Sequence, residues 1–150
     1  MILVVSSDER RPLTDAVVAM LEERGHQPLL LGPLVGEPLS WPRAAEVLAL
    51  AVVEGRAAGG VLFCHTGTGA SIAANKVPGI RAALCVDAQT ARGARWWNDA
   101  NVLVMSLRLT SVDVAREILD AWLSEEPRPE EAGCLAELGE MERRWRKRSR

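Results

Sequence analysis

The chain has 150 residues, of which 48% are hydrophobic and 25% are charged. This is the length of one ordinary domain with a sizeable core, so we expect a single folding unit. The formal net charge of −2 excludes a strongly basic nucleic-acid-binding protein, although residues 143–150 are rich in arginine. A basic tail can bind nucleic acid, but a solvated helix end explains it more simply, and we expect no nucleic-acid partner.

The sequence also argues against a membrane or disulfide-rich protein. No stretch approaches the roughly 20 apolar residues that cross a bilayer, and no basic region precedes the apolar N-terminus. The three cysteines, Cys64, Cys85 and Cys134, lack the spacing of a metal site. We therefore expect reduced thiols, no metal, no membrane contact and a cytoplasmic location.

Strand-like apolar runs alternate with helix-like segments along the chain. Pro12 suits the first turn of a helix and Gly25 its end, and residues 32–42 form a loop rich in glycine and proline. The alternation predicts an α/β fold of the Rossmann-like type, with three layers (α/β/α) and a doubly wound sheet of five parallel strands. The expected strands are residues 2–5, 28–31, 61–63, 81–85 and 102–105, and the expected helices are residues 12–24, 43–54, 71–76, 88–96 and 112–123.

The pattern changes after Pro127-Arg128-Pro129. Residues 130–147 predict one more helix, which is charged and has a sparse apolar stripe. That spacing fits a face laid against another surface, and a helix beyond a proline-bounded linker can reach a partner subunit. We therefore expect a Rossmann-like domain in residues 1–126, and a linker with an extra C-terminal helix, packed on a partner subunit, in residues 127–150.

The strongest chemical signal is the segment around Cys64. An apolar run ends at this cysteine and continues through Thr66-Gly67-Thr68-Gly69 into a helix-like pattern. Ligands of doubly wound sheets bind at the carboxyl ends of the strands. Glycines let the backbone approach a ligand closely, and amides near a helix start can hold a phosphate or a developing oxyanion. The segment therefore predicts a reactive site.

Two interpretations of Cys64 remain open at this point. A cysteine at the end of a buried strand is often only a small apolar side chain. Alternatively, the nearby amides stabilise a thiolate, which makes Cys64 a base or a nucleophile. In that case Thr66, Thr68 and Ser71 offer hydroxyls for proton relay, although Ser71 equally suits a helix cap.

Charged residues follow the first strand at the same expected edge of the sheet. Asp8 and Glu9 can cap the next helix, or they can face a substrate. In the second case Asp8 accepts hydrogen bonds from hydroxyls and Glu9 acts as an acid or a base. Arg10 and Arg11 suit a phosphate or a carboxylate, but ordinary surface arginines explain them equally well.

Aromatic residues and histidines give weaker signals. Trp96 and Trp97 cannot both face the core from one helix, so at least one lines an interface or a pocket. His65 follows Cys64, but adjacent side chains near a strand end point apart, which argues against His65 as the partner of the thiol. His26 lies in a helix-to-strand turn and is expected to be inert.

The chain resembles the ribose-5-phosphate isomerase B family, which also contains the galactose-6-phosphate isomerase subunits. The matches fall in order in separate elements across nearly the whole body of the chain, which is why it is identified as a member. They are Ser7-Asp8, Cys64 with Thr66-Gly67-Thr68-Gly69, Ser71-Ile72-Ala73-Ala74-Asn75-Lys76, residues 79–85, Asn98-Asp99-Ala100-Asn101-Val102-Leu103, Arg108, and Ala121-Trp122-Leu123.

The resemblance implies an aldose-ketose isomerase of a sugar or sugar phosphate that needs no metal or organic cofactor. Such an enzyme moves a proton between C1 and C2 through a cis-enediolate. The family also implies homodimers, or tetramers of dimers, whose active sites use residues of both subunits. By position, the base maps onto Cys64 with Thr66 beside it, the anion loop onto Gly67, Thr68 and Gly69, the sugar-binding aspartate onto Asp8, and the asparagine at the reacting oxygens onto Asn98.

The chain departs from the family pattern at several positions. Glu9 and Trp97 stand where the family usually has histidines, and the second of these is the one assigned to ring opening. His65 replaces a glycine. Residues 130–137 contain no basic residue where the family has two phosphate-binding arginines. Arg108 is the expected phosphate ligand that clearly remains.

Three hypotheses follow. The first is an isomerase whose chemistry is kept but whose substrate has changed, since Trp97 makes a pocket more apolar and offers a stacking surface. The second is a repurposed enzyme that catalyses an epimerisation, dehydration or cyclisation in a specialised pathway, and the third is a catalytically silent partner subunit. We favour the first, with Cys64, Thr66, Glu9 and Asn98 as catalytic candidates and Asp8, Gly67, Thr68, Gly69, Ser71, Trp97, Arg108, Arg10 and Arg11 as substrate-binding candidates.

Overall fold

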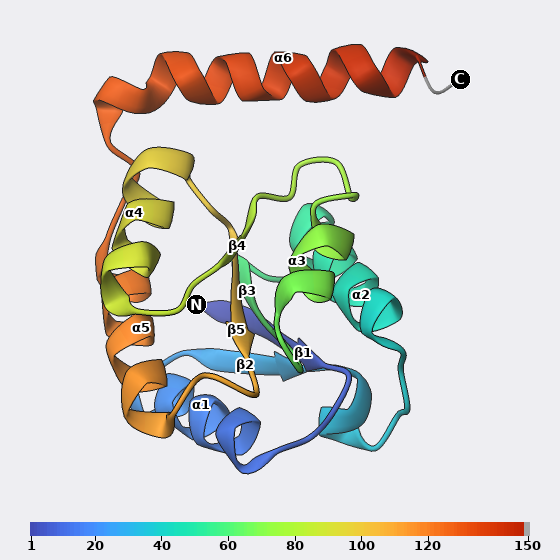
Figure 1. The fold of residues 1–150 in the computed structure, drawn as a ribbon, viewed down its shortest axis with the longest axis vertical. Helices are drawn as coiled ribbons and strands as arrows, with labels where there is room; N and C mark the ends of the chain where they lie inside the picture. Colours follow the sequence, from blue (N-terminus) through green and yellow to red (C-terminus); the bar gives the residue numbers. More distant parts are fainter. Residues whose placement is uncertain (149–150) are drawn as a thin grey trace.

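The computed structural model describes residues 1–148, which contain one five-stranded parallel sheet with helices on both faces (Figure 1). The strands are β1 (Ile2–Ser7), β2 (Gln27–Leu30), β3 (Gly59–Cys64), β4 (Ala82–Leu84) and β5 (Val102–Ser106). The α-helices are α1 (Pro12–Glu23), α2 (Trp41–Val53), α3 (Thr68–Ala74), α4 (Ala88–Asn98), α5 (Val112–Ser124) and α6 (Ala132–Arg148). Two short 3₁₀ helices, η1 (Gly32–Val35) and η2 (Pro129–Glu131), lie in the connections.

The predicted doubly wound sheet is confirmed by the strand order β2-β1-β3-β5-β4. The chain leaves β1 toward β2 on one side, and it then crosses to β3 on the other side of β1. Between β1 and β3 the direction of winding therefore reverses. Ligands of open α/β sheets bind outside the carboxyl ends of the strands at such a point.

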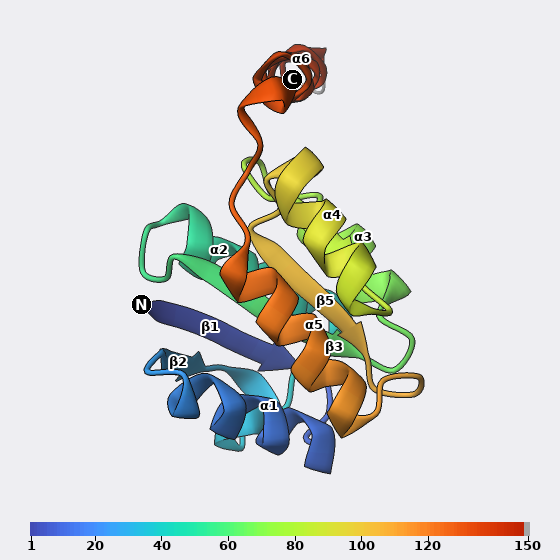
Figure 2. The same ribbon diagram turned by 90° about the vertical axis from the view of Figure 1, so that its left-hand side faces the viewer.

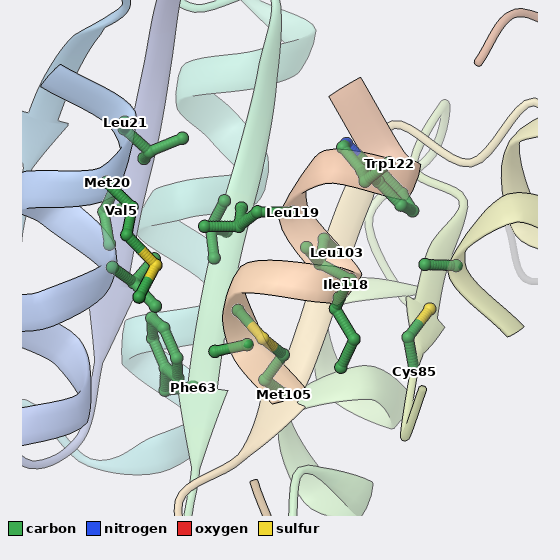
Figure 3. Close-up of a cluster of buried hydrophobic side chains, with 14 of the residues drawn as sticks. Val5, Met20, Leu21, Phe63, Cys85, Leu103, Met105, Ile118, Leu119 and Trp122 are labelled. Carbon is green, nitrogen blue, oxygen red and sulfur yellow. The ribbon is translucent and has the colours of Figure 1, made fainter. Parts of the chain in front are cut away.

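Two apolar layers cover the sheet, because alternate residues of each strand face opposite sides. All six residues of β3 are buried, as expected for a strand covered on both faces. Figure 3 shows the layer beneath α1 and α5, which contains Val5, Phe63, Leu103 and Met105 of the sheet, Met20 and Leu21 of α1, and Ile118, Leu119 and Trp122 of α5.

The second layer lies beneath α2 and α3. Val4, Leu62 and Val104 of the sheet pack there against Leu48 of α2, and Cys64 belongs to the same cluster. The thiol therefore faces the α2 and α3 side of the sheet, at the end of a strand that is buried throughout.

Most of the predicted helices end or begin one to three residues away from the predicted position, and three of these differences have a clear cause. Helix α3 begins at Thr68 and not at Ser71. Gly67, directly before Thr68, adopts a left-handed conformation (φ 82°) and is the N-cap of the helix. Helix α2 begins at Trp41 with a proline in its first turn, where the missing N–H costs nothing. Helix α4 continues to Asn98 and ends at Asp99, which is also left-handed (φ 44°).

The predicted extra C-terminal helix is confirmed as α6. It crosses the amino-terminal edge of the sheet, beside the end of α4, and Figure 2 shows it end-on beyond the linker that follows α5. The Gly79 N–H donates to Glu142 Oε1 (2.8 Å), which ties α6 to the body. A hollow of about 850 Å³ lies beneath α6, lined by Ile80, Met141 and Trp145 among others. Residues 149–150 of the basic segment lie outside the described residues.

Between residues 1 and 148, no helix has the length and apolar character needed to cross a bilayer.

Candidate active site

Cys64 and Asp8 meet at the point where the winding of the sheet reverses. Cys64 is the last residue of β3, and Asp8 directly follows β1. The register pairs Ser7 with Phe63, so the next residues, Asp8 and Cys64, are level at the carboxyl edge. Cys64 is 7% exposed, so it is almost fully covered in the absence of a ligand. The sequence prediction that these two residues share a crevice agrees with this placement.

The glycine loop after Cys64 is shaped by the conformation of Gly67. A Cβ at this position would lie 2.5 Å from Leu84 Cδ1, and the positive φ further disfavours any other residue. The Thr66 and Thr68 hydroxyls lie 2.8 Å apart and both residues are exposed, so they form a hydrogen-bonded pair that is open to solvent at this edge. Such a pair can pass a proton between two oxygens of a bound molecule.

Trp41 is a residue of this site that the sequence reasoning missed. It is the first residue of α2 and is 45% exposed, although it is a tryptophan. Its ring covers Gly69 so closely that a Cβ there would lie 3.1 Å from Trp41 Cε3. Trp41 thus forms an aromatic wall beside the glycine loop. A large aromatic residue just before Pro42, at a helix start where it cannot reach the core, was the available signal.

Asp8 is held ready to accept a hydrogen bond. Its Oδ1 atom is buried and has no hydrogen-bond partner among residues 1–148. The turn that contains it is fixed, because the Ser7 hydroxyl donates to the Glu9 carbonyl (2.6 Å) and accepts from the Glu9 N–H (3.2 Å). Burial raises the pKa of Asp8, against a backbone hydrogen bond and the charges of His65 and Arg11, which lower it. A substrate hydroxyl would supply the missing donor.

This burial predicts that Asp8 reduces the stability of the fold at neutral pH. We expect Asp8→Asn to raise the free energy of unfolding by up to about 1 kcal/mol at pH 7, because a charged carboxylate is then no longer desolvated. A pKa that is raised in the folded state costs stability above that pKa, so the gain should vanish as the pH falls toward the ordinary value of 3.8.

Urea unfolding at several pH values measures this difference. Asp15→Asn is the matched control, because Asp15 is exposed and paired with Arg10 at 2.9 Å, and it should give no gain. A gain for Asp8→Asn that stays constant down to pH 3 would show that the charge is not its cause.

The three arginines near Cys64 and Asp8 differ in whether they are already paired with a carboxylate. Arg10 pairs with Asp15, and Arg11 Nε donates to Glu9 Oε2 (2.6 Å), all on the surface. Exposed pairs of this kind contribute about 0–1 kcal/mol and are easily exchanged for another anion. Arg108 is exposed, and within residues 1–148 its side chain forms no ion pair. Of the three arginines at this edge, Arg108 is therefore the one whose guanidinium is not paired with a carboxylate among the described residues.

Ser71 serves the fold more than the crevice. Its hydroxyl lies 3.5 Å from the Ala82 carbonyl on β4, and Gly67, not Ser71, caps α3. Asn75 strengthens the same connection, because its side chain donates to the Ala82 carbonyl (2.9 Å) and accepts from the Ala82 N–H (2.8 Å). The alternative in which Ser71 caps the helix is wrong, because Ser71 lies inside α3, and its contacts favour a structural role over proton relay.

Trp97 and Asn98 lie far from Cys64 within one chain. Helix α4 starts at the carboxyl edge of the sheet and runs back to the amino edge, so its last residues are at the opposite end from the crevice (Figure 1). Asn98 is exposed and lines the hollow beneath α6, and Trp97 is 47% exposed and packs over Gly93. One chain therefore does not bring these two candidates to the thiol.

Trp96 and Trp97 have different surroundings, as expected for neighbours on one helix. The Arg128 guanidinium lies 3.9 Å from the centre of the Trp96 ring, and the Trp96 N–H donates to Glu125. This contact fastens the linker after α5 to α4. Trp97 is the more exposed of the two.

The remaining cysteines do not join the site. Cys85 is fully buried, and burial together with the charge of Asp87 raises its pKa to about 12, which keeps the thiol protonated. Cys134 is exposed on α6. No cluster of three or more metal-ligating side chains occurs in residues 1–148.

Known proteins share both the sequence and the fold. A family model described as Ribose/Galactose Isomerase matches residues 2–134. The chain is 43% identical to ribose-5-phosphate isomerase B of Escherichia coli over 111 residues, which cover 74% of each protein. It is 44% identical to a D-erythrulose-4-phosphate isomerase of Pectobacterium atrosepticum over 91 residues, or 61% of this chain and 60% of that protein.

The solved structure of Clostridium thermocellum ribose-5-phosphate isomerase B is similar over almost its full length. The TM-score is 0.91 at 36% sequence identity, and the match covers 97% of this chain and 99% of that one. The structural match therefore covers nearly the whole chain. The chain belongs to the ribose/galactose isomerase family.

Proposed function

We propose that the chain is an aldose-ketose isomerase of a sugar phosphate in which Cys64 is the base. The observation that carries the proposal is the position of Cys64, which ends β3 at the carboxyl edge of the sheet, level with Asp8, whose buried Oδ1 atom has no hydrogen-bond partner among residues 1–148. Relatives named as isomerases of ribose 5-phosphate and erythrulose 4-phosphate support the reaction class.

In the proposed reaction the Cys64 thiolate removes the proton from the carbon next to the carbonyl. The resulting cis-enediolate carries negative charge on its oxygens, next to the loop that contains Gly67 and Gly69. The hydroxyl pair of Thr66 and Thr68 passes a proton between the two oxygens, and the thiol then returns its proton to the neighbouring carbon. Asp8 orients the sugar by accepting a hydroxyl hydrogen bond.

The substrate proposed here differs from that of a standard ribose-5-phosphate isomerase B. Arg108 is available for a phosphate, whereas Glu9 holds Arg11 in an ion pair and brings negative charge to the same edge. Trp41 adds an aromatic wall, and Trp97 adds a second exposed ring. A sugar phosphate with a larger apolar face than ribose 5-phosphate suits this set of side chains.

We further propose that the active enzyme is a homodimer, or a tetramer of dimers, in the cytoplasm. Asn98 and Trp97 are exposed at the edge opposite Cys64, so they can contribute only to the crevice of another copy. The exposed apolar residues of α6, Leu138, Met141 and Trp145, provide a surface for that copy. No organic cofactor or metal takes part in the proposed chemistry.

Solvent exchange tests the reaction class. We expect the purified protein, incubated in deuterated water with pentose, tetrose and hexose phosphates, to place deuterium on the carbon next to the carbonyl of at least one sugar. Mass spectrometry and NMR identify the position. Absence of exchange with every sugar would contradict the proposal, and exchange that appears only after a paralogue is added would identify a silent partner subunit instead.

A further inference from the structure

Isomerisation of a cyclic sugar needs a second acid-base step besides the one assigned to Cys64. A cyclic hemiacetal must first lose the proton of its anomeric hydroxyl, break the bond between C1 and the ring oxygen, and gain a proton on that oxygen. Only the open chain has the carbonyl group that makes the neighbouring proton acidic. A group that both accepts and donates protons near neutral pH is needed close to the thiol.

Most titratable groups at the carboxyl edge already form an ion pair or a hydrogen bond within the protein. Glu9 pairs with Arg11. Asp87 caps α4 by accepting the Thr90 N–H (2.7 Å), which lowers its pKa. Besides the thiol of Cys64, this leaves Asp8 and His65 among the described groups at the crevice.

His65 combines a fixed backbone with a free side chain. Its carbonyl accepts hydrogen bonds from the Arg108 N–H (3.0 Å) and from the Ser106 hydroxyl (3.0 Å), so its main chain is held from β5. The imidazole is exposed, and across residues 1–148 it forms no hydrogen bond or ion pair. The side chain is therefore open to a bound molecule at this edge of the sheet, and no contact among the described residues requires it for the fold.

His65 also lies next to the carboxylate that orients the sugar. The parallel pairing of β1 and β3 places the loop with Asp8 beside the loop with His65. The charge of His65 lowers the pKa of Asp8, which is consistent with this proximity. An imidazole beside a carboxylate with an open acceptor position is an arrangement suited to proton transfer with a hydroxylated ligand.

We propose that His65 opens the ring of a cyclic sugar phosphate before Cys64 acts, an inference that rests on the proposed isomerase function. The neutral imidazole accepts the proton of the anomeric hydroxyl as the bond between C1 and the ring oxygen breaks. The imidazolium then donates this proton to the ring oxygen, while the carbonyl forms at C1. No net proton and no other reactant is consumed, and the imidazole need not touch the thiol.

Two substrates that differ only in ring closure test this role. An aldopentose 5-phosphate closes to a furanose, whereas the matching 2-ketopentose 5-phosphate has no free hydroxyl that can close a five-membered ring. We expect His65→Asn to slow isomerisation of the aldose by about 10²- to 10³-fold. Deuterium exchange at C1 of the ketose should stay within about threefold of the wild-type rate, because this step uses Cys64 without ring opening.

His26→Asn is the matched control, since His26 is the other of the two histidines and precedes β2 at the amino edge of the sheet. It should change neither rate. Equal losses of both rates in His65→Asn would mean that His65 binds the substrate or supports the loop, and unchanged rates would exclude any role. Either result overturns the inference while the isomerase proposal stands. Wild-type protein inactive on both sugars would overturn the isomerase proposal for pentose phosphates, and the inference with it.

Discussion

Replacing Cys64 by serine is expected to lower kcat for isomerisation by about 10² to 10⁴, with KM changed by less than about threefold. A hydroxyl is a much weaker acid than a thiol, so serine does not supply an anionic base at neutral pH. The contacts expected to hold the sugar come from Asp8, Arg108 and Trp41, and the substitution leaves these unchanged. The loss should therefore fall on the proton-transfer step.

Deuterium exchange into the open-chain ketose reports this step directly and should fall by the same factor as kcat. Cys134→Ser is the matched control, because Cys134 is exposed on α6, and its activity should equal that of the wild type. Urea unfolding checks that the small change at the buried Cys64 leaves the fold intact. A Cys64→Ser enzyme with full exchange activity would exclude Cys64 as the base, whichever sugar is the substrate.

The local part of the site was predictable from the sequence, because its members are close together in the chain. An apolar run that ends in Cys64 and continues into Thr66-Gly67-Thr68-Gly69 fixes a strand, a turn and a helix start in one short segment. The position of Asp8 followed from strand topology, since the carboxyl ends of parallel strands share one edge. These inferences depend on the order of strand-like and helix-like segments in the sequence, and not on how individual side chains pack.

The boundary of α3 shows where such reasoning loses accuracy. Serine is common at helix starts, so a start at Ser71 was a natural expectation. The backbone of Gly67 is left-handed, and this conformation starts the helix earlier. The sequence contains the glycine, but it does not state which of two nearby glycines adopts the positive φ.

Contacts between distant segments could not be predicted. Trp41 covers Gly69 because α2 and the glycine loop lie together on one face of the sheet, and no local pattern connects these two residues. The pairing of Arg11 with Glu9 is likewise a choice among surface side chains of similar energy. The opposite positions of Asn98 and Cys64 depend on the length and direction of α4.

These opposite positions have a testable consequence for the shared site. We expect Cys64→Ala and Asn98→Ala each to be nearly inactive. Loss of the Asn98 amide, which we expect to stabilise the enediolate oxygens, should lower the rate of isomerisation by about 10²- to 10³-fold. Mixed dimers of the two variants contain one crevice with both defects and one with neither. When equal amounts of the two variants are unfolded together and refolded, about half of the dimers are mixed. Each mixed dimer has one intact crevice of two, so activity should return to about a quarter of the wild-type value.

A second mixture distinguishes a shared site from a general effect of mixing. Thr66 lies in the same loop as Cys64 and belongs to the same crevice, so a mixture of Cys64→Ala and Thr66→Ala has no intact crevice in any dimer. This mixture should stay inactive after the same unfolding and refolding. If the mixture with Asn98→Ala also stays inactive, although a different affinity tag on each variant allows mixed dimers to be isolated, Asn98 does not act in the crevice of the other copy. Recovery in the first mixture and not in the second would mean that Asn98 and Cys64 reach one substrate from two different chains.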